Sequence, residues 1–315
     1  MPSPRAALPL LELAALLTAA LLALAFQLTL PSRLPSEAEH RAAAAALVRE
    51  ARPGDVVLLF PWWTERARLF LPEGLPVVGY FGSDADALDA HPRIWVLAQP
   101  GLPRSDEARF REHFLPGRTP LAAPRTFGTL TLTPYANGRH RPRSFDAVQA
   151  LGGARVYLES PDGAREPCRF DGRAHRCPGP AHLRVAAEWH EVAYRPLHCL
   201  WMHPPGGDRR LVAELDVPPP GAPAALRLRA GLIWEHARAV DPQRISTTRV
   251  TAEAEGLAPL LLELPPGHEG LRTVEQPLPT GAARTVRVAV QAERAQARWV
   301  CVQLQALQQP QAVGP

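Results

Sequence analysis

The stretch RRLVAELDVPPPGAPAALRLRAGLIWE (residues 209–235) holds two short β-type runs separated by a turn rich in Pro and Gly. The same texture fills the chain from about Phe145 onward, with about eight such runs and no long helical pattern. The others include ARVYLES (154–160), HLRVAAEWHEVAY (182–194), RISTTRVTAE (244–253), PLLLELP (259–265), RTVRVAVQAE (284–293) and RWVCVQLQA (298–306). This pattern is typical of an all-β sandwich, which we predict over 145–310, after a linker at 136–144.

Residues 36–135 have a different pattern, in which helical and strand-like segments alternate. The Ala-rich segment 37–51 predicts a helix with Ser36 as its N-cap, and 106–114 predicts a second helix. Continuous apolar runs, typical of strands covered on both faces, lie at 55–60, 75–80 and 93–98, and TFGTLTLTPY (126–135) suggests an edge strand. We predict a small α/β domain with a parallel core.

The apolar run LPLLELAALLTAALLALAFQLTL (8–30) is long enough to cross a bilayer. Arg5 and the amino terminus before it favour a cytoplasmic N-terminus, which would place the bulk of the chain in the periplasm, attached by a single span to the cytoplasmic (inner) membrane. The alternative is a signal peptide cleaved after Ala23-Leu24-Ala25. Either interpretation exports the protein.

The cysteines all lie in the second half, at Cys168, Cys177, Cys199 and Cys301. An even number in an exported domain favours disulfides, and of the three possible pairings we predict 168–177 with 199–301. Four buried thiols are the alternative. A zinc site is not expected because no C-x₂-C pair is present, and we predict no metal and no cofactor.

The charge of the chain argues against nucleic acid as a partner. All 35 basic residues are Arg, set against 31 acids, and the net charge of +4 is small and dispersed. The function classes that remain are those of an exported enzyme, a binding module or a structural module.

The segment 47–80 with HPRIWVLAQP (91–100) resembles the extracytoplasmic tail of bacterial dolichyl-phosphate-mannose-type membrane glycosyltransferases, close to the protein O-mannosyltransferases. The matching positions are Pro53, Gly54, Asp55, Arg93 and Trp95. Further on, CRFDGRAHRC (168–177), RPLHCLWMHPP (195–205) and Ala230-Gly231-Leu232 resemble the jelly-roll modules attached to such tails, which are also similar to galactose-binding-like sandwiches. The resemblance implies a jelly-roll for the sandwich.

The departure from that family bears on activity. Those enzymes carry their catalytic acids on an outer loop between earlier membrane spans, and this chain has one candidate span and lacks that loop. No catalytic residue can therefore be carried over. The resemblance implies an accessory part of a transferase, or one half of a split one.

Motifs for catalysis are weak. Ser83-Asp84-Ala85-Asp86 contains the D-x-D that many sugar transferases use for a metal, but a helix start with Ser83 as N-cap is the favoured explanation. The histidines at 175, 182, 190, 198 and 203, with Asp171 and Glu191 nearby, have spacings that fit neither one helix face nor a tight loop. Acid pairs among Glu188, Glu191 and Glu235 have separations that sequence does not give. Enzymatic activity stays uncertain, and a non-catalytic role is favoured.

Aromatic residues are the remaining functional signal, because sugars stack on Trp and Tyr faces while Arg, Asn and Asp supply hydrogen bonds. Trp62 and Trp63 directly follow the strand at 55–60, where open α/β sheets place ligand clefts, which makes them the candidate ligand-binding residues. Packing against the membrane or the sandwich is the favoured alternative for this pair. The tryptophans inside strand-like runs, Trp189, Trp201, Trp234 and Trp299, are predicted to be core residues.

Three functions are compatible with these patterns. The first is a non-catalytic, membrane-anchored accessory or glycan-binding protein linked to lipid-linked sugar transfer. The second is a subunit of a split polyprenyl-phosphate-sugar glycosyltransferase, and the third is a structural protein-interaction module. The expected partners are the lipid bilayer, a glycan or lipid-linked sugar, and a polytopic glycosyltransferase.

Overall fold

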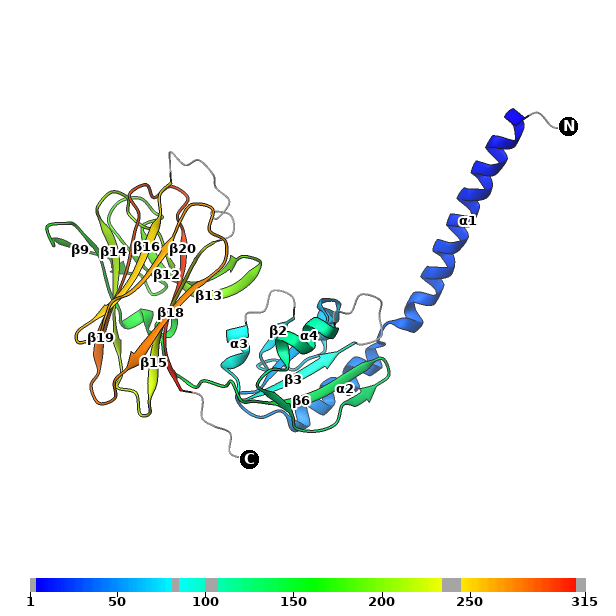
Figure 1. Ribbon diagram of the computed structural model, residues 1–315, viewed down its shortest axis with the longest axis horizontal. Helices are drawn as coiled ribbons and strands as arrows, with labels where there is room; N and C mark the ends of the chain where they lie inside the picture. Colours follow the sequence, from blue (N-terminus) through cyan, green and yellow to red (C-terminus); the bar gives the residue numbers. More distant parts are fainter. Residues whose placement is uncertain (1–3, 81–84, 100–106, 234–244, 310–315) are drawn as a thin grey trace. The chain divides into compact units, whose positions relative to one another are not determined.

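The computed structural model describes residues 4–80, 85–99, 107–233 and 245–309, and the chain divides into two compact units (Figure 1). The first unit comprises Met1–Phe81 and Pro92–Asn137, and the second comprises Gly82–His91 and Gly138–Pro315. Most of the regular structure is β-sheet, preceded by an apolar N-terminal helix.

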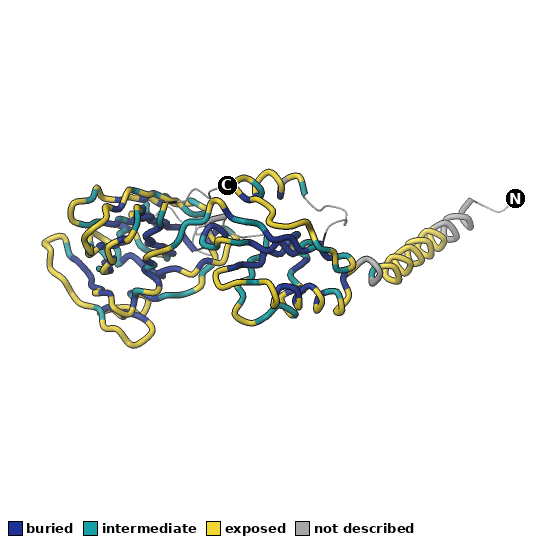
Figure 2. The backbone as a smooth tube through the Cα atoms, turned by 90° about the horizontal axis from the view of Figure 1, so that it is seen from below, coloured by how far each residue is buried: buried dark blue, intermediate teal, exposed yellow. Residues whose placement is uncertain are grey.

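The N-terminal helix α1 (Pro4–Arg33) contains the segment Glu12–Leu30, whose mean hydropathy is 2.2. Residues 12–29 of this segment are exposed and Leu30 is half-buried (Figure 2). Among the described residues, α1 is the one helix that is long and apolar enough to span a membrane. A signal sequence can have the same length and composition. Together with the two disulfides, it fits a single-pass membrane protein or a secreted protein with an extracellular domain.

The first unit is built on a mixed sheet. Strand β1 (Val56–Phe60) lies parallel to β2 (Val77–Gly79) and β3 (Arg93–Ala98), and β3 pairs antiparallel with β6 (Leu130–Asn137). The edge position predicted for 126–135 is wrong, because β6 also pairs on its far side with β4 (Arg118–Pro120) and β5 (Arg125–Phe127). Strands β4 and β5 have three residues each, which is too short for a sequence pattern to indicate a strand.

The helices of this unit begin and end close to where the sequence predicts. Helix α2 (Glu37–Glu50) starts with the capping box of Ser36 and Glu39, which confirms Ser36 as the N-cap. Helix α4 (Glu107–Phe114) confirms the prediction for 106–114, and the 3₁₀ helix η1 (Trp62–Leu69) follows β1. Buried Ala and Leu side chains of α2 pack on the sheet with Val57, Leu59 and Trp95.

A buried carboxylate joins the two motifs on which the family resemblance rests. Asp55, 1% exposed, accepts hydrogen bonds from Arg93 Nε at 3.0 Å, from Trp95 Nε1 at 2.8 Å and from the Arg52 amide at 2.9 Å. Burial alone would raise the pKa of Asp55, but the hydrogen bonds from Arg93, Arg52 and Trp95 outweigh it and lower that pKa. The ionised Asp55 side chain therefore holds the Pro-Gly-Asp turn and strand β3 together.

Replacing Asp55 by Asn is expected to destabilise the first unit by about 3–5 kcal/mol, because it leaves the Arg93 charge without its anion. A lowered pKa in the folded state means that the stabilisation is complete above the unfolded pKa of about 3.9 and is lost as the pH falls through the folded pKa. Denaturant unfolding of both proteins below about pH 4 should show this loss in the wild type and not in Asp55→Asn. Equal stability of the two at neutral pH would contradict the prediction.

The second unit is a β-sandwich of two sheets. The eight-stranded sheet has the order β10-β11-β12-β13-β20-β15-β18, with β7 also paired to β20, and the six-stranded sheet has the order β17-β16-β19-β14-β8-β9. The stretch 209–235 crosses between them, since β14 and β15 belong to different sheets. Val, Leu and Ala side chains from both sheets form one core. This arrangement is consistent with a jelly-roll.

The strand bounds of the eight-stranded sheet are β7 (Arg143–Asp146), β10 (Arg169–Phe170), β11 (Ala174–Arg176), β12 (Arg184–Val192), β13 (Arg195–Met202), β15 (Ala224–Leu232), β18 (Arg272–Leu278) and β20 (Val300–Gln308). Those of the six-stranded sheet are β8 (Arg155–Glu159), β9 (Arg165–Pro167), β14 (Arg210–Val217), β16 (Thr248–Ala254), β17 (Leu260–Leu264) and β19 (Arg284–Gln291). The short helices are α3 (Ala85–Asp89), α5 (Ala147–Ala150) and η2 (Leu151–Gly153).

Both predicted disulfides are confirmed. Cys168–Cys177 closes a short loop with a sequence separation of 9, and Cys199–Cys301 joins β13 to β20 across a separation of 102. Cys199 and Cys301 are both fully buried, within an apolar cluster that includes Val192, Leu197 and Ile233. The second bridge therefore fastens the last strand to the middle of the sheet.

Removing the long-range bridge should cost more stability than removing the short one. By the chain-entropy estimate, the free energy of unfolding falls by about 4–5 kcal/mol in Cys199→Ala/Cys301→Ala and by about 2–3 kcal/mol in Cys168→Ala/Cys177→Ala. The reason is that a bridge closing a longer loop restrains the unfolded chain more strongly. Chemical unfolding of the two double variants checks the order. A larger loss for the short loop would contradict it.

Candidate functional site

Two rows of polar side chains cross the outer face of the eight-stranded sheet. In one row Gln303 on β20 lies opposite Arg229 on β15, which lies opposite Thr273 on β18. In the other, Gln305, Arg227 and Glu275 occupy the same three strands. The intervening residues point into the core, as strand alternation requires. We call Arg227, Arg229, Gln303 and Gln305 the Arg–Gln ladder.

Hydrogen bonds fix the side chains of the Arg–Gln ladder. Arg227 donates to Gln305 Oε1 at 2.7 Å, and Arg229 donates to Gln303 Oε1 at 3.2 Å. The amide nitrogens donate in turn, Gln303 to the His198 carbonyl at 2.9 Å and Gln305 to Asp146 Oδ2 at 3.2 Å. Both arginines are buried, at 6% and 5% exposed, and Arg227 Nε also lies 3.9 Å from Glu275. Donors held in this way are preorganised for a polar ligand.

An exposed aromatic platform lies beside the ladder. Trp189 on β12 is 68% exposed and stacks on His198 of β13, with ring centroids 5.1 Å apart and planes 9° apart. The prediction that Trp189 is a core residue is wrong. Strand β13 pairs with β20 only over Leu200–Met202, so the hairpin carries Trp189 and His198 beyond that paired region. Trp201, at 3% exposed, is buried, and its ring contacts the half-buried Trp299 edge to face, with centroids 5.3 Å apart.

The hairpin that carries Trp189 is held by packing at its turn. Its turn residues Ala193 and Tyr194 have φ of 49° and 65°, which costs non-glycine residues on the order of 1–3 kcal/mol each. Directly before the turn, Val192 packs so closely over Gly231 that a Cβ on Gly231 would lie 2.7 Å from Val192 Cγ1 and 2.6 Å from the Gly270 carbonyl oxygen. This packing holds the strained turn in place.

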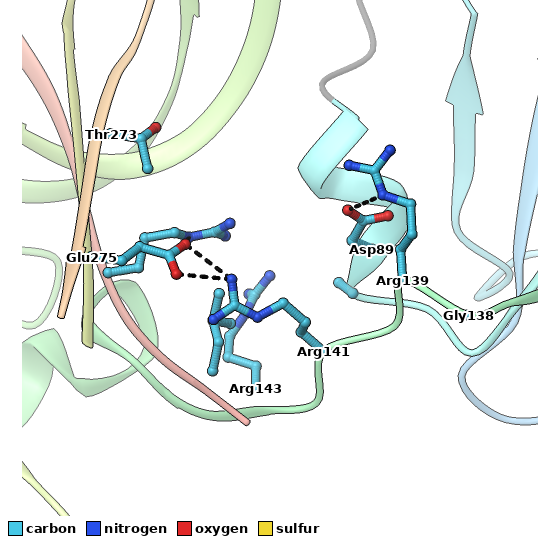
Figure 3. Close-up of a pocket in the computed structure, with 10 residues that line it drawn as sticks. Asp89, Gly138, Arg139, Arg141, Arg143, Thr273 and Glu275 are labelled. Atoms are coloured by element: carbon cyan, nitrogen blue, oxygen red, sulfur yellow. Dashed lines mark hydrogen bonds and ion pairs between the residues drawn. The ribbon is translucent and has the colours of Figure 1, made fainter. Parts of the chain in front are cut away.

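Two adjoining cavities open on this face. One of about 290 Å³ is lined by Trp189, His198 and the Arg–Gln ladder, among others. Figure 3 shows the other, of about 470 Å³, whose lining residues all belong to the second unit. There Arg141 donates to both carboxylate oxygens of Glu275 at 3.0 Å, and Arg139 lies 3.4 Å from Asp89. The cavities share Arg143 and Arg227, so they form one polar, aromatic-edged surface.

The residues predicted to bind a ligand lie elsewhere. Trp62 and Trp63 begin η1, directly after β1, and Trp63 is half-buried, while the Trp62 side chain lies outside the described residues. Ser83 and Asp84 of the D-x-D also lie outside them, as do Trp234, Glu235 and the side chain of Asp86. The ligand-binding role of Trp62 and Trp63 stays a prediction.

The structure separates most of the histidine-rich stretch. His175 is buried, with Nε2 3.0 Å from the Leu151 carbonyl, whereas His190 lies 3.1 Å from Glu188. His182 and His203 form a ring pair 4.5 Å apart. In the part of the chain that the structure describes, no three His, Cys, Asp or Glu side chains are grouped so that they could hold a metal ion.

The outer face of the six-stranded sheet carries acids that sequence reasoning missed. Glu214 accepts a hydrogen bond from Tyr157 at 2.6 Å and pairs with Arg155 at 3.0 Å, and Glu159, 6% exposed, pairs with Arg210 and Arg287. Burial alone would raise the pKa of Glu214, but hydrogen bonds from Tyr157 and Arg155 lower it. This group stays ionised, so it is unsuited to act as a general acid near neutral pH.

The Arg–Gln ladder was also missed, although the sequence contains its signal. In Leu226-Arg-Leu-Arg (226–229) and Val302-Gln-Leu-Gln (302–305), polar and apolar residues alternate, which indicates a strand with one polar face. The pairing that sets the two polar faces side by side is a property of the fold.

Replacing Trp189 by Ala should change the free energy of unfolding by less than about 1 kcal/mol, because the exposed ring contributes little packing. Trp201→Ala should cost about 3–5 kcal/mol, because that ring is buried. Thermal unfolding of both variants measures the difference. A loss in Trp189→Ala as large as that in Trp201→Ala would contradict the exposed position.

No family model matches the chain, and no curated protein matches it. Solved structures that resemble it include CBM51 from Clostridium perfringens GH95 in complex with methyl-galactose (12% identity, 48% of this chain, 86% of that chain, TM-score 0.25). Another is the xylan-binding module CBM15, with 11% identity over 50% of this chain and 93% of that chain and a TM-score of 0.27. A third is TmCBM61 in complex with β-1,4-galactotriose, with 7% identity over 53% of this chain and 96% of that chain and a TM-score of 0.24. This chain covers only 16% to 28% of the length of some longer matching chains, among them a family GH115 4-O-methyl-α-glucuronidase. The chain is thus loosely similar to carbohydrate-binding modules, and TM-scores this low assign neither a family nor a function.

Proposed function

We propose that the chain is a non-catalytic glycan-binding protein, held at a membrane by α1, whose β-sandwich binds a saccharide beside Trp189. The observation that carries this proposal is a 68% exposed Trp stacked on His198 next to the fixed Arg–Gln ladder. An exposed, supported indole gives the apolar C–H face of a sugar ring a surface to stack on. The ladder supplies hydrogen-bond donors at fixed positions for the hydroxyls.

The fixed geometry favours binding because few groups need to be ordered when the ligand arrives. The Gln amides are already held by Arg227, Arg229, His198 and Asp146, and the indole is already stacked. The entropy lost on binding is correspondingly small.

A finer proposal concerns the setting of this activity. An accessory role beside a polytopic glycosyltransferase that uses lipid-linked sugars, or a place in a split transferase, is supported by the sequence resemblance and by the candidate membrane helix. Co-purification of the full chain from solubilised membranes with a polytopic transferase would test it, and recovery without such a partner would contradict it.

Replacing Trp189 by Ala should weaken saccharide binding about tenfold or more, because stacking and the water excluded by the ring are both lost. Arg229→Met should weaken it similarly while keeping the apolar stem of the side chain. The measurement is calorimetric titration of the full chain in detergent with methyl-galactose, β-1,4-galactotriose and xylan oligosaccharides.

The matched control is Phe170→Ala, which removes another exposed aromatic ring of the same sandwich, 39% exposed. It should bind like the wild type. Affinity unchanged in Trp189→Ala, an equal loss in Phe170→Ala, or no binding of any of these saccharides by the wild type would overturn the proposal.

A further inference from the structure

A three-residue connection keeps helix α2 next to the end of α1. Helix α1 ends at Arg33 and α2 begins at Glu37, so only residues 34–36 lie between them. A fully extended connection of this length spans at most about 14 Å. If α1 is a retained membrane span, as proposed above, the first turn of α2 stays close to the bilayer surface.

The helix η1 packs on that first turn. Arg66 lies 4.0 Å from Glu37, the first residue of α2, and the Phe70 ring stacks on the buried His40 with centroids 4.9 Å apart. The guanidinium of Arg41 lies 5.9 Å from the centre of the same Phe70 ring. These contacts bring the C-terminal end of η1 to the end of α2 that is nearest the membrane span.

The C-terminal end of η1 presents an apolar side chain without cover. Leu69 is 80% exposed, and the flanking Arg66 and Arg68 side chains are 54% and 42% exposed. Arg68 also pairs with Glu65 and donates to the Val77 carbonyl at 2.8 Å, which holds its guanidinium beside Leu69. An exposed Leu between Arg side chains suits the boundary between lipid headgroups and acyl chains, where the apolar group inserts and the Arg side chains lie at the level of the headgroups.

We propose that Leu69, with Arg66 and Arg68, docks on the phospholipid surface beside the membrane span. The occupant of this surface is the bilayer interface, which is argued from the short connection to α1 and the packing of η1 on α2. The first unit is then fixed against the membrane at two points, the span and the end of η1.

An internal control lies at the other end of α2. Leu121 is 51% exposed and lines a shallow cavity with Arg49 and Ala51, at the C-terminal end of that helix. The 14 residues of α2 are about 21 Å long, so Leu121 lies well away from the end next to α1. Leu69 and Leu121 thus form a matched pair of exposed leucines in one unit.

The test is photolabelling of the full chain in phosphatidylcholine vesicles that contain a phospholipid with a diazirine high in its acyl chain, followed by peptide mapping. The proposal predicts labelling of α1 and of the segment containing Leu69, without labelling around Leu121. Leu69→Ser should reduce labelling of its own segment about tenfold or more and leave α1 labelling unchanged, since burying a Leu side chain shifts the docking equilibrium by at least about that factor. Leu121→Ser should change neither.

Labelled α1 with an unlabelled Leu69 segment would overturn the docking proposal and leave the membrane anchor intact. Unlabelled α1 would show that the anchor itself is wrong, and the docking proposal falls with it. Unchanged labelling of the segment in Leu69→Ser would also overturn it, and thermal unfolding of that variant confirms that it is folded.

Discussion

The alternation of side chains along β20 is the constraint on which the second unit depends. Val300, Val302, Leu304 and Ala306 are at most 1% exposed and form part of the core, while Cys301, Gln303 and Gln305 lie on the opposite face. The strand pairs with β13, β15 and β7, so three neighbours share its register. A shift by one residue would place the glutamines in the core and break the Cys199–Cys301 bridge.

The candidate site forms where the pairing of β20 changes partner. Strand β13 pairs with Val300–Val302 and then leaves, and β7 takes up the pairing from Gln305 onward. Gln303 lies at the gap and still donates to the His198 carbonyl of the departing strand. The splayed hairpin exposes Trp189 at the edge of the cavity that the Arg–Gln ladder lines. A break in regular pairing thus creates a surface that a continuous sheet would lack.

Local patterns predicted what depends on local physics. The Ser36 capping box, the helix at 107–114, the sandwich class and the short Cys168–Cys177 bridge follow from short-range composition and spacing. The Cys199–Cys301 bridge was predicted as one of three possible pairings, from the strand-like runs that contain the two cysteines. The exposure of Trp189 did not follow, because a strand pattern does not tell where a hairpin runs beyond its neighbours. The inner position of β6 was not predicted for a related reason, because its partners β4 and β5 are too short to be recognised in the sequence. The Arg–Gln ladder required the register of β15 against β20.

The two outer faces of the sandwich use arginine in different ways, and the difference bears on function. On the six-stranded sheet, Arg155, Glu214, Arg287 and Glu253 alternate in one row across four strands. Each carboxylate there lies between two guanidinium groups, so donors and acceptors satisfy one another and the row mainly holds the sheet. On the eight-stranded sheet, the arginines lie opposite glutamines. The Gln oxygen accepts a hydrogen bond from its Arg and the Gln nitrogen donates another, which orients the guanidinium group, and Arg227 also lies 3.9 Å from Glu275. Because these oriented polar groups line a cavity next to an exposed indole, we propose binding on this face and a structural role for the other.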